Sequence, residues 1–183
     1  NRNYRSIAVG SNHFGVLDVD QSYRSTRQIA LPNGLEGTFY VVVDTALPSN
    51  VFEHRFGGNN RRVSSATNIT VAPSPDLIVE AITAPPEAKS GTKIDVEWTV
   101  RNTGDAAADG RWSDRVSLKP VGDPNASLIN VGIFETSLTL DAGLSYTRAE
   151  QISLSAELEG AFQVVVHSNF TGSLYEHAAA ADN

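Results

Sequence analysis

Two neighbouring aspartates in the first part of the chain could hold a metal ion. Asp18 and Asp20 lie in the stretch LDVD, and carboxylate oxygens are ligands that Ca²⁺ prefers. A calcium site needs about six to eight oxygens, and the chain has no D-x-D-x-D-G loop to supply them. We therefore expect ordinary turn carboxylates at both positions, with Ca²⁺ binding as the alternative and no other cofactor.

Two Glu-His pairs also suggest metal ligands, because Glu53-His54 recurs further along the chain as Glu176-His177. Adjacent residues of a strand point to opposite faces, so one pair cannot chelate an ion without a bend in the backbone. We expect a structural role for both pairs at strand ends.

Aromatic side chains could form a platform for a sugar, and the candidates are Trp98, Trp112, Tyr23 and Tyr146. Trp98 is in phase with alternating apolar residues, which predicts a core position. Trp112 follows a glycine turn and has charged residues nearby, so it is the aromatic residue with the best chance of touching a ligand. A core position is still the favoured interpretation of Trp112.

The sequence does not predict an enzyme. It contains no G-x-S-x-G, no H-E-x-x-H, no phosphate loop and no recognisable acid/base pair of carboxylates. It has no cysteine, so disulfides, thiolate metal sites and cysteine nucleophiles are absent. The net charge of −7 with scattered basic residues argues against a nucleic-acid surface, and no apolar run is long enough to insert into a membrane.

An internal repeat organises the chain. The segment GTFYVVVD at Gly37–Asp44 returns as GAFQVVVH at Gly160–His167, and Phe39 and Phe162 lie 123 positions apart (162 − 39). The two Glu-His pairs are separated by the same offset. One constant offset over many residues indicates a tandem repeat, and a period of this length can bury a core of its own.

Alternation of apolar and polar residues predicts β-strands throughout. It is cleanest in KIDVEWTV at residues 93–100, and no apolar stripe at helical spacing persists over three turns. We predict an all-β fold of tandem immunoglobulin-like β-sandwich modules. The expected strands are 23–31, 39–43, 61–72, 76–79, 93–100, 112–118, 128–134, 146–154 and 161–168, with 39–43 a central strand that has both faces at least partly covered. The expected centre of the core is Ile94, Val96, Trp98, Phe162, Val164 and Val166.

The repeat also predicts the domain boundaries. Residues 1–72 are the later part of a first sandwich, residues 73–75 a proline-containing linker, and residues 76–183 a second sandwich. Asp182-Asn183 aligns with Asn59-Asn60, so the second sandwich is expected to lack its last strand. Neighbouring copies could complete the open edges by strand complementation through residues 61–72, or the ends could simply fray.

Five longer segments point to a known family: PDLIVEAITAP (Pro75–Pro85), WTVRNTGDAA (Trp98–Ala107), WSDRVSL (Trp112–Leu118), LDAGLSYT (Leu140–Thr147) and VFEHRFGGNN (Val51–Asn60). As a set they resemble CARDB, the cell-adhesion-related domain found in bacteria. The resemblance covers one nearly complete copy and the later part of another. It implies an immunoglobulin-like sandwich of about seven strands, used in tandem in secreted or surface-attached proteins. The family offers no catalytic residues to carry over.

We therefore expect a non-catalytic module that serves adhesion, cohesion or extension at the cell surface. The expected partners are neighbouring copies of the module and a cell-surface or glycan partner. The alternative is a glycan- or Ca²⁺-binding accessory module of a secreted protein such as a peptidase.

Overall fold

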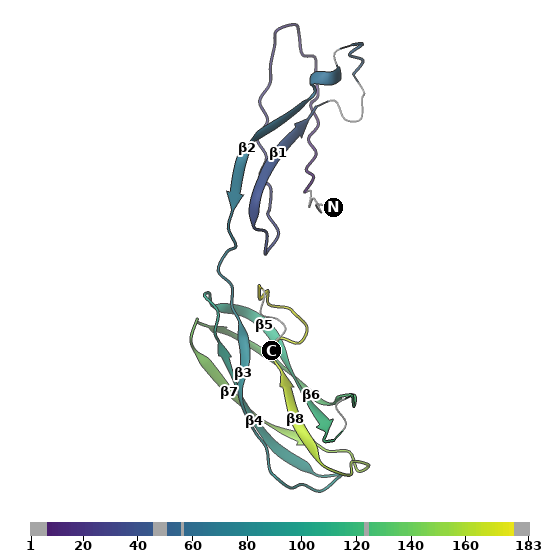
Figure 1. The fold of residues 1–183 in the computed structure, drawn as a ribbon, viewed down its shortest axis with the longest axis vertical. Helices are drawn as coiled ribbons and strands as arrows, with labels where there is room; N and C mark the ends of the chain where they lie inside the picture. The colour runs from purple at the N-terminus through teal and green to yellow at the C-terminus, as the bar shows by residue number, and fades with distance from the viewer. Residues whose placement is uncertain (1–6, 46–50, 56, 123–124, 178–183) are drawn as a thin grey trace.

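The structure is a computed structural model that describes residues 7–45, 51–55, 57–122 and 125–177. The predicted all-β fold is confirmed, because these residues form eight strands, one short 3₁₀ turn and no α-helix. The predicted alignment of Asp182-Asn183 lies outside the described residues. The elements are β1 (Gly37–Asp44), η1 (Gly57–Asn59), β2 (Arg61–Ile69), β3 (Leu77–Thr83), β4 (Lys93–Asn102), β5 (Ala108–Pro120), β6 (Ile129–Leu140), β7 (Ser145–Ser153) and β8 (Phe162–His167) (Figure 1).

Six of the strands form two antiparallel sheets that face each other. One sheet has the order β3-β4-β7 and the other the order β6-β5-β8 (Figure 1). Strand β4 shows why they pack, because its burial alternates and Val96, Trp98 and Val100 all lie on the dry face. A sheet with one apolar face has to bury that face against another layer.

The core between the sheets draws apolar side chains from every one of the six strands. Trp98 of β4 and Trp112 of β5 are each only 1% exposed, so the two indoles are the largest side chains in the interior. The predicted core positions Val96, Trp98 and Val166 are confirmed as buried, while Ile94 and Val164 are partly buried against them. Phe162 is also only partly buried.

Strands β1 and β2 form a separate two-stranded sheet (Figure 1). They pair from Gly37 opposite Ile69 to Asp44 opposite Arg61. The prediction that residues 39–43 form a central strand with both faces at least partly covered is wrong, because β1 belongs to a two-stranded sheet and Val41, Val42 and Val43 are 50%, 50% and 54% exposed. Among the described residues β1 has one neighbouring strand, so its valines have no second layer to pack against.

The predicted strand at residues 23–31 is also wrong, because these residues have no regular secondary structure. At the 123-residue offset they correspond to β7, which pairs along its length with β4. Among the described residues, the segment 23–31 has the sequence pattern of a strand but no strand to pair with.

Two turns nevertheless recur at the same offset with the same hydrogen bond. The Leu35 amide donates to the Pro32 carbonyl at 3.3 Å, and the Leu158 amide donates to the Ser155 carbonyl at 3.3 Å. The glycine that follows each turn lies in the left-handed region, with φ of 109° at Gly37 and 110° at Gly160. Glycine populates this region without steric penalty, which explains why both segments use it there.

Candidate functional site

A buried carboxylate is the most conspicuous polar group between the two sheets. Asp114 of β5 is 0% exposed, and three side chains donate hydrogen bonds to it. The donors are the Trp98 indole at 2.9 Å, the Tyr146 hydroxyl at 2.5 Å and the Ser168 hydroxyl at 2.8 Å. Charge-assisted hydrogen bonds of this kind can compensate a carboxylate for its lost hydration. Because Trp98 and Tyr146 belong to the opposite sheet, Asp114 joins the two layers.

Tyr146 extends this network to the second tryptophan. Its hydroxyl accepts a hydrogen bond from the Trp112 indole at 3.2 Å while it donates to Asp114. Burial, followed by the negative charge of Asp114 and the hydrogen bond to it, raises the pKa of Tyr146 well above its ordinary value. Tyr146 therefore stays protonated and acts as a fixed hydrogen-bond donor.

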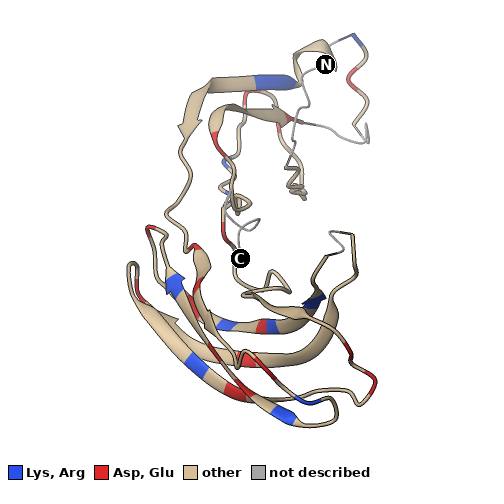
Figure 2. Ribbon diagram, turned by 60° about the horizontal axis from the view of Figure 1, so that its bottom comes forward, with Lys and Arg blue, Asp and Glu red and all other residues tan. Residues whose placement is uncertain are grey.

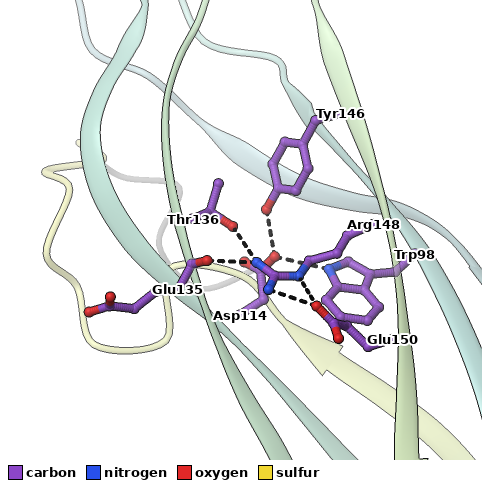
Figure 3. Close-up of polar contacts among 7 residues, drawn as sticks. All are labelled: Trp98, Asp114, Glu135, Thr136, Tyr146, Arg148 and Glu150. Carbon is purple, nitrogen blue, oxygen red and sulfur yellow. Dashed lines mark hydrogen bonds and ion pairs between the residues drawn. The ribbon is translucent and has the colours of Figure 1, made fainter.

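A second connection between the sheets lies beside the first (Figure 3). The Arg148 guanidinium of β7 donates to the backbone carbonyl of Glu135 on β6 at 2.6 Å. It also pairs with Glu150 at 2.7 Å and lies over the Phe134 ring at 5.2 Å. Arg148 thus holds together the two edge strands β6 and β7, which belong to different sheets.

The segment after β8 is fastened back onto the start of β3. Glu176 is 5% exposed and accepts hydrogen bonds from the Leu77 amide and from Asn169, both at 2.6 Å. Asn169 adopts a left-handed φ of 45°, which asparagine tolerates, and its side chain also donates to the Leu174 carbonyl. Through these contacts Glu176 joins the segment after β8 to the start of β3.

The first Glu-His pair, Glu53-His54, makes different contacts from Glu176-His177. The side-chain amide of Asn60 donates a hydrogen bond to Glu53 at 2.5 Å, and His54 has a left-handed φ of 48°. In the second pair, the His177 Nδ1 atom lies 3.0 Å from the Tyr175 hydroxyl. Within the described residues no group of three or more His, Cys, Asp or Glu side chains is placed to hold a metal ion.

The aspartates with the LDVD spacing lie in an exposed turn. The Asp18 carbonyl accepts the Gln21 amide at 3.0 Å, and its counterpart Asp141 accepts the Leu144 amide at 3.1 Å. Asp20 has a φ of 63° where the second turn has Gly143 with a φ of 81°. In both turns the hydrogen bond runs to the backbone carbonyl of the aspartate, so the two turns share one backbone geometry. Binding of Ca²⁺ to Asp18 and Asp20 stays a prediction.

Trp112, the sequence-based candidate for ligand contact, is in the core. Its ring lies 6.0 Å from the Tyr146 ring, and the side chain is 1% exposed, so it offers no surface to a glycan. The alternative prediction, an exposed Trp112, is wrong because Trp112 lies on the face of β5 that packs against the other sheet. Tyr23 is 51% exposed and stacks on His13 with ring centroids 4.2 Å apart.

Sequence reasoning did not identify Asp114, although a signal was present. Asp114 is in phase with Trp112, Val116 and Leu118, so one charged residue interrupts an apolar inward row. A carboxylate in such a row must find donors, and the fold supplies them from Trp98, Tyr146 and Ser168. Alternation could have predicted the burial of Asp114, but not its partners.

The outer face of the second sheet carries a cationic group beside β8. Arg115 of β5 lies opposite His167, with its Nη2 atom 3.5 Å from the imidazole, and its guanidinium lies 5.1 Å over the Phe170 ring. The Arg115 Nε atom is buried and has no hydrogen-bond partner. Burial and then the charge of Arg115 lower the pKa of His167, against the opposing influence of Glu176.

A depression on the described part of the chain is lined by Thr83, Ala84, Pro85, Asp95, Val96, Glu97 and Ala149, and no member of the Asp114 network lines it. Basic and acidic residues are interspersed over the ribbon without gathering on one face (Figure 2). No helix among the described residues is long and apolar enough to span a membrane.

Comparison with known proteins gives one family match. The family model CARDB matches residues 74–169, which is just over half of the chain, as a single copy. A β-glucosidase from Listeria innocua, solved in complex with glucose, is similar over 55% of this chain and 15% of its own, at 19% identity and a TM-score of 0.34. A similarity that low carries no conclusion. No curated protein matches the chain.

Proposed function

The chain belongs to the CARDB family, and from this premise we propose that it is a non-catalytic, adhesion-related module of a secreted or surface-attached bacterial protein. The module acts as a spacer that resists mechanical unfolding between other parts of that protein, and it supports cohesion or attachment. The module is an immunoglobulin-like sandwich used in tandem, with residues 1–72 derived from a preceding copy. Residues 73–75 are the linker, and residues 76–183 are the second copy.

The Asp114 network is the observation that best supports this role. An active site needs a titratable group that substrate can reach, whereas Asp114 is fully buried and satisfied by three donors. The hydrogen bonds from Trp98 and Tyr146, together with the Arg148 contact to β6, resist separation of the sheets. Resistance to separation is the property that a load-bearing spacer requires.

The tandem arrangement is supported by the paired turns. The same hydrogen bond and nearly the same glycine φ occur before β1 and before β8, and both glycines are followed by related apolar segments. Sequence repeats that also repeat local backbone geometry indicate two copies of one structural unit.

Single-molecule stretching of the full chain between terminal handles tests the proposal. We expect one cooperative unfolding event for β3 to β8, with a length gain of roughly 30 nm for a chain segment of this size. Asp114→Ala should lower the unfolding force of that event, whereas Arg111→Ala, a change at an exposed position of the same strand, should leave it unchanged. Gradual extension without a resolved event would contradict the proposed role.

A further inference from the structure

The linker that leads from β2 into β3 is bound to the sandwich by its backbone (Figure 1). The Ser74 carbonyl accepts the amides of Asp105 and Ala106 at 3.0 and 3.3 Å. Two residues further on, the Asp76 carbonyl accepts the Thr103 amide at 2.7 Å. The linker also contains two prolines, whose fixed φ removes further freedom. Rotation about the linker would therefore have to break backbone hydrogen bonds at two points.

Asn102, at the end of β4, shapes the turn that receives the linker. Its side chain is 0% exposed. The side-chain carbonyl accepts the amides of Asp76 and Gly104, both at 3.1 Å. The side-chain nitrogen donates to the carbonyls of Ala106 at 2.8 Å and Leu140 at 2.9 Å. One buried and fully bonded amide thus fixes the linker, the turn and the end of β6 to one another, and such a network is costly to disturb.

Gly104 is the residue of the turn that the linker approaches most closely. It has no left-handed φ, so its backbone conformation does not explain the missing side chain. A Cβ atom at Gly104 would overlap the Ser74 carbonyl oxygen and would lie 2.6 Å from the Asp76 amide nitrogen. Both are backbone atoms and cannot swing aside as the end of a flexible side chain can. Any other residue at position 104 would therefore lift the linker off the turn.

The turn before β1 meets the sandwich at a second place. A Cβ atom at Gly34 would overlap the Tyr175 hydroxyl oxygen and would lie 3.4 Å from the His177 Nδ1 atom, so the turn lies against the segment that follows β8. Leu35, the next residue, is 7% exposed, although the valines of β1 are half exposed. The same segment also reaches the linker, because the His177 amide donates to the Ser74 hydroxyl at 3.4 Å.

Small contacts between parts of one chain usually allow the parts to move relative to each other. Here two attachments act together, because the β1–β2 sheet is joined to the sandwich through the linker and also through the turn at residues 32–37. A rotation about either attachment would separate the groups that meet at the other.

From these contacts we infer that Ser74, Gly104 and Tyr175 belong to a docking surface at one end of the sandwich, and that this surface holds the β1–β2 sheet at a fixed angle to the sandwich. Its partner is the turn at residues 32–37 of the same chain, with glycine at the point of contact. The inference rests on the proposed spacer function, to which it adds a defined direction: the spacer is a stiff joint instead of two parts on a free hinge.

Distances between two spin labels on the full chain test this inference. The chain has no cysteine, so Thr67→Cys on β2 and Thr147→Cys on β7 introduce unique labelling sites, both at exposed positions. Double electron–electron resonance then gives the distribution of distances between the β1–β2 sheet and the sandwich. A fixed joint predicts one narrow peak, whereas a free hinge predicts a broad distribution.

Two further changes, each made separately in the labelled chain, address the two attachments. Gly104→Ala should displace the linker, and Tyr175→Ala should remove the contact with the turn. Gly10→Ala is the control for the first change, since a Cβ atom at Gly10 would have no described atom beyond its chain neighbours within 4 Å. Phe52→Ala is the control for the second, because Phe52 stands 123 positions before Tyr175 and is 89% exposed.

We expect Gly104→Ala and Tyr175→Ala each to broaden or shift the narrow peak, and both controls to leave it unchanged. A broad distribution in the labelled chain itself, or a peak that neither change alters, would overturn the inference. Thermal unfolding verifies that each variant is folded. Tyr175 is 39% exposed, so Tyr175→Ala keeps the test available if Gly104→Ala does not fold. The force that unfolds β3 to β8 does not depend on this angle, so the docking surface and the mechanical role can fail separately.

Discussion

Strands β1 and β8 have nearly the same sequence and opposite environments. Val43 of β1 is 54% exposed, whereas its counterpart Val166 of β8 is 5% exposed. Ile29 and Ile152, also 123 positions apart, are 43% and 1% exposed. The preceding turns have the same hydrogen bond in both units. Local sequence therefore reproduces the turn and the extended backbone, and neighbouring strands decide whether the side chains are buried.

The largest expected contrast comes from removing matched side chains. Ile152→Ala should lower the free energy of unfolding of the sandwich by about 2–5 kcal/mol, because it leaves a cavity in a packed core. Ile29→Ala should change it by less than about 0.5 kcal/mol, as is usual for exposed positions. Chemical denaturation of both variants checks this. Similar losses would show that residues 23–31 pack against a partner in solution.

A charge placed on neighbouring positions of β8 should produce the next largest difference. Val164 packs against the core, so we expect Val164→Asp to lower the free energy of unfolding by about 2–3 kcal/mol. Val165→Asp, on the outer face, should be better tolerated. The matched changes Val41→Asp and Val42→Asp in β1 should have equal effects, since both valines are 50% exposed. Thermal unfolding midpoints compare all four, and equal losses at 164 and 165 would reverse the assigned face.

Asp114→Asn should have an intermediate effect. The amide keeps the shape of the side chain but loses one acceptor oxygen and the charge that strengthens three hydrogen bonds, so we expect a loss of about 1–3 kcal/mol. The phenol of Tyr146 should then ionise at a lower pH, which ultraviolet difference spectra can follow. An unchanged tyrosine titration would show that burial alone raises the pKa of Tyr146.

The smallest expected effect is a pH dependence from His167. Its pKa is lower in the folded chain than in the unfolded chain, so the unfolded state binds the proton more tightly. The stability contribution is complete above the unfolded pKa of about 6.5 and is lost as pH falls toward the folded pKa. His167→Gln should therefore flatten the decline in melting temperature between neutral and mildly acidic pH. A parallel decline in both proteins would assign it to other groups.

Much of the sandwich could be predicted from the sequence. The alternation in residues 93–100 predicted the dry face of β4, and the in-phase position of Trp98 predicted its burial. The strand at 23–31 was predicted equally well by its pattern, yet it has no ladder. Alternation of apolar and polar residues indicates that a segment is suited to a β-strand. It does not indicate whether a second strand is available to pair with that segment.

The candidate site was less accessible to prediction. Trp112 and Asp114 are both inward residues of β5, but their hydrogen-bond partners come from β4 and β7, and for Asp114 also from Ser168 just after β8. Such partners are separated by tens of positions, and only the packing of the two sheets sets which of them meet. The aromatic residue types suggested a sugar-binding platform. In the structure Trp98, Trp112 and Tyr146 are instead part of the hydrogen-bond network between the two sheets.

By itself, the sequence determined the 123-residue repeat, the all-β class and the turns at Gly37 and Gly160, because alternation and glycine conformation act between residues close in the chain. Tertiary structure alone decided that Asp114 joins the sheets and that the β1 valines stay exposed. These outcomes depend on which strands lie beside one another, and contacts of that kind are non-local.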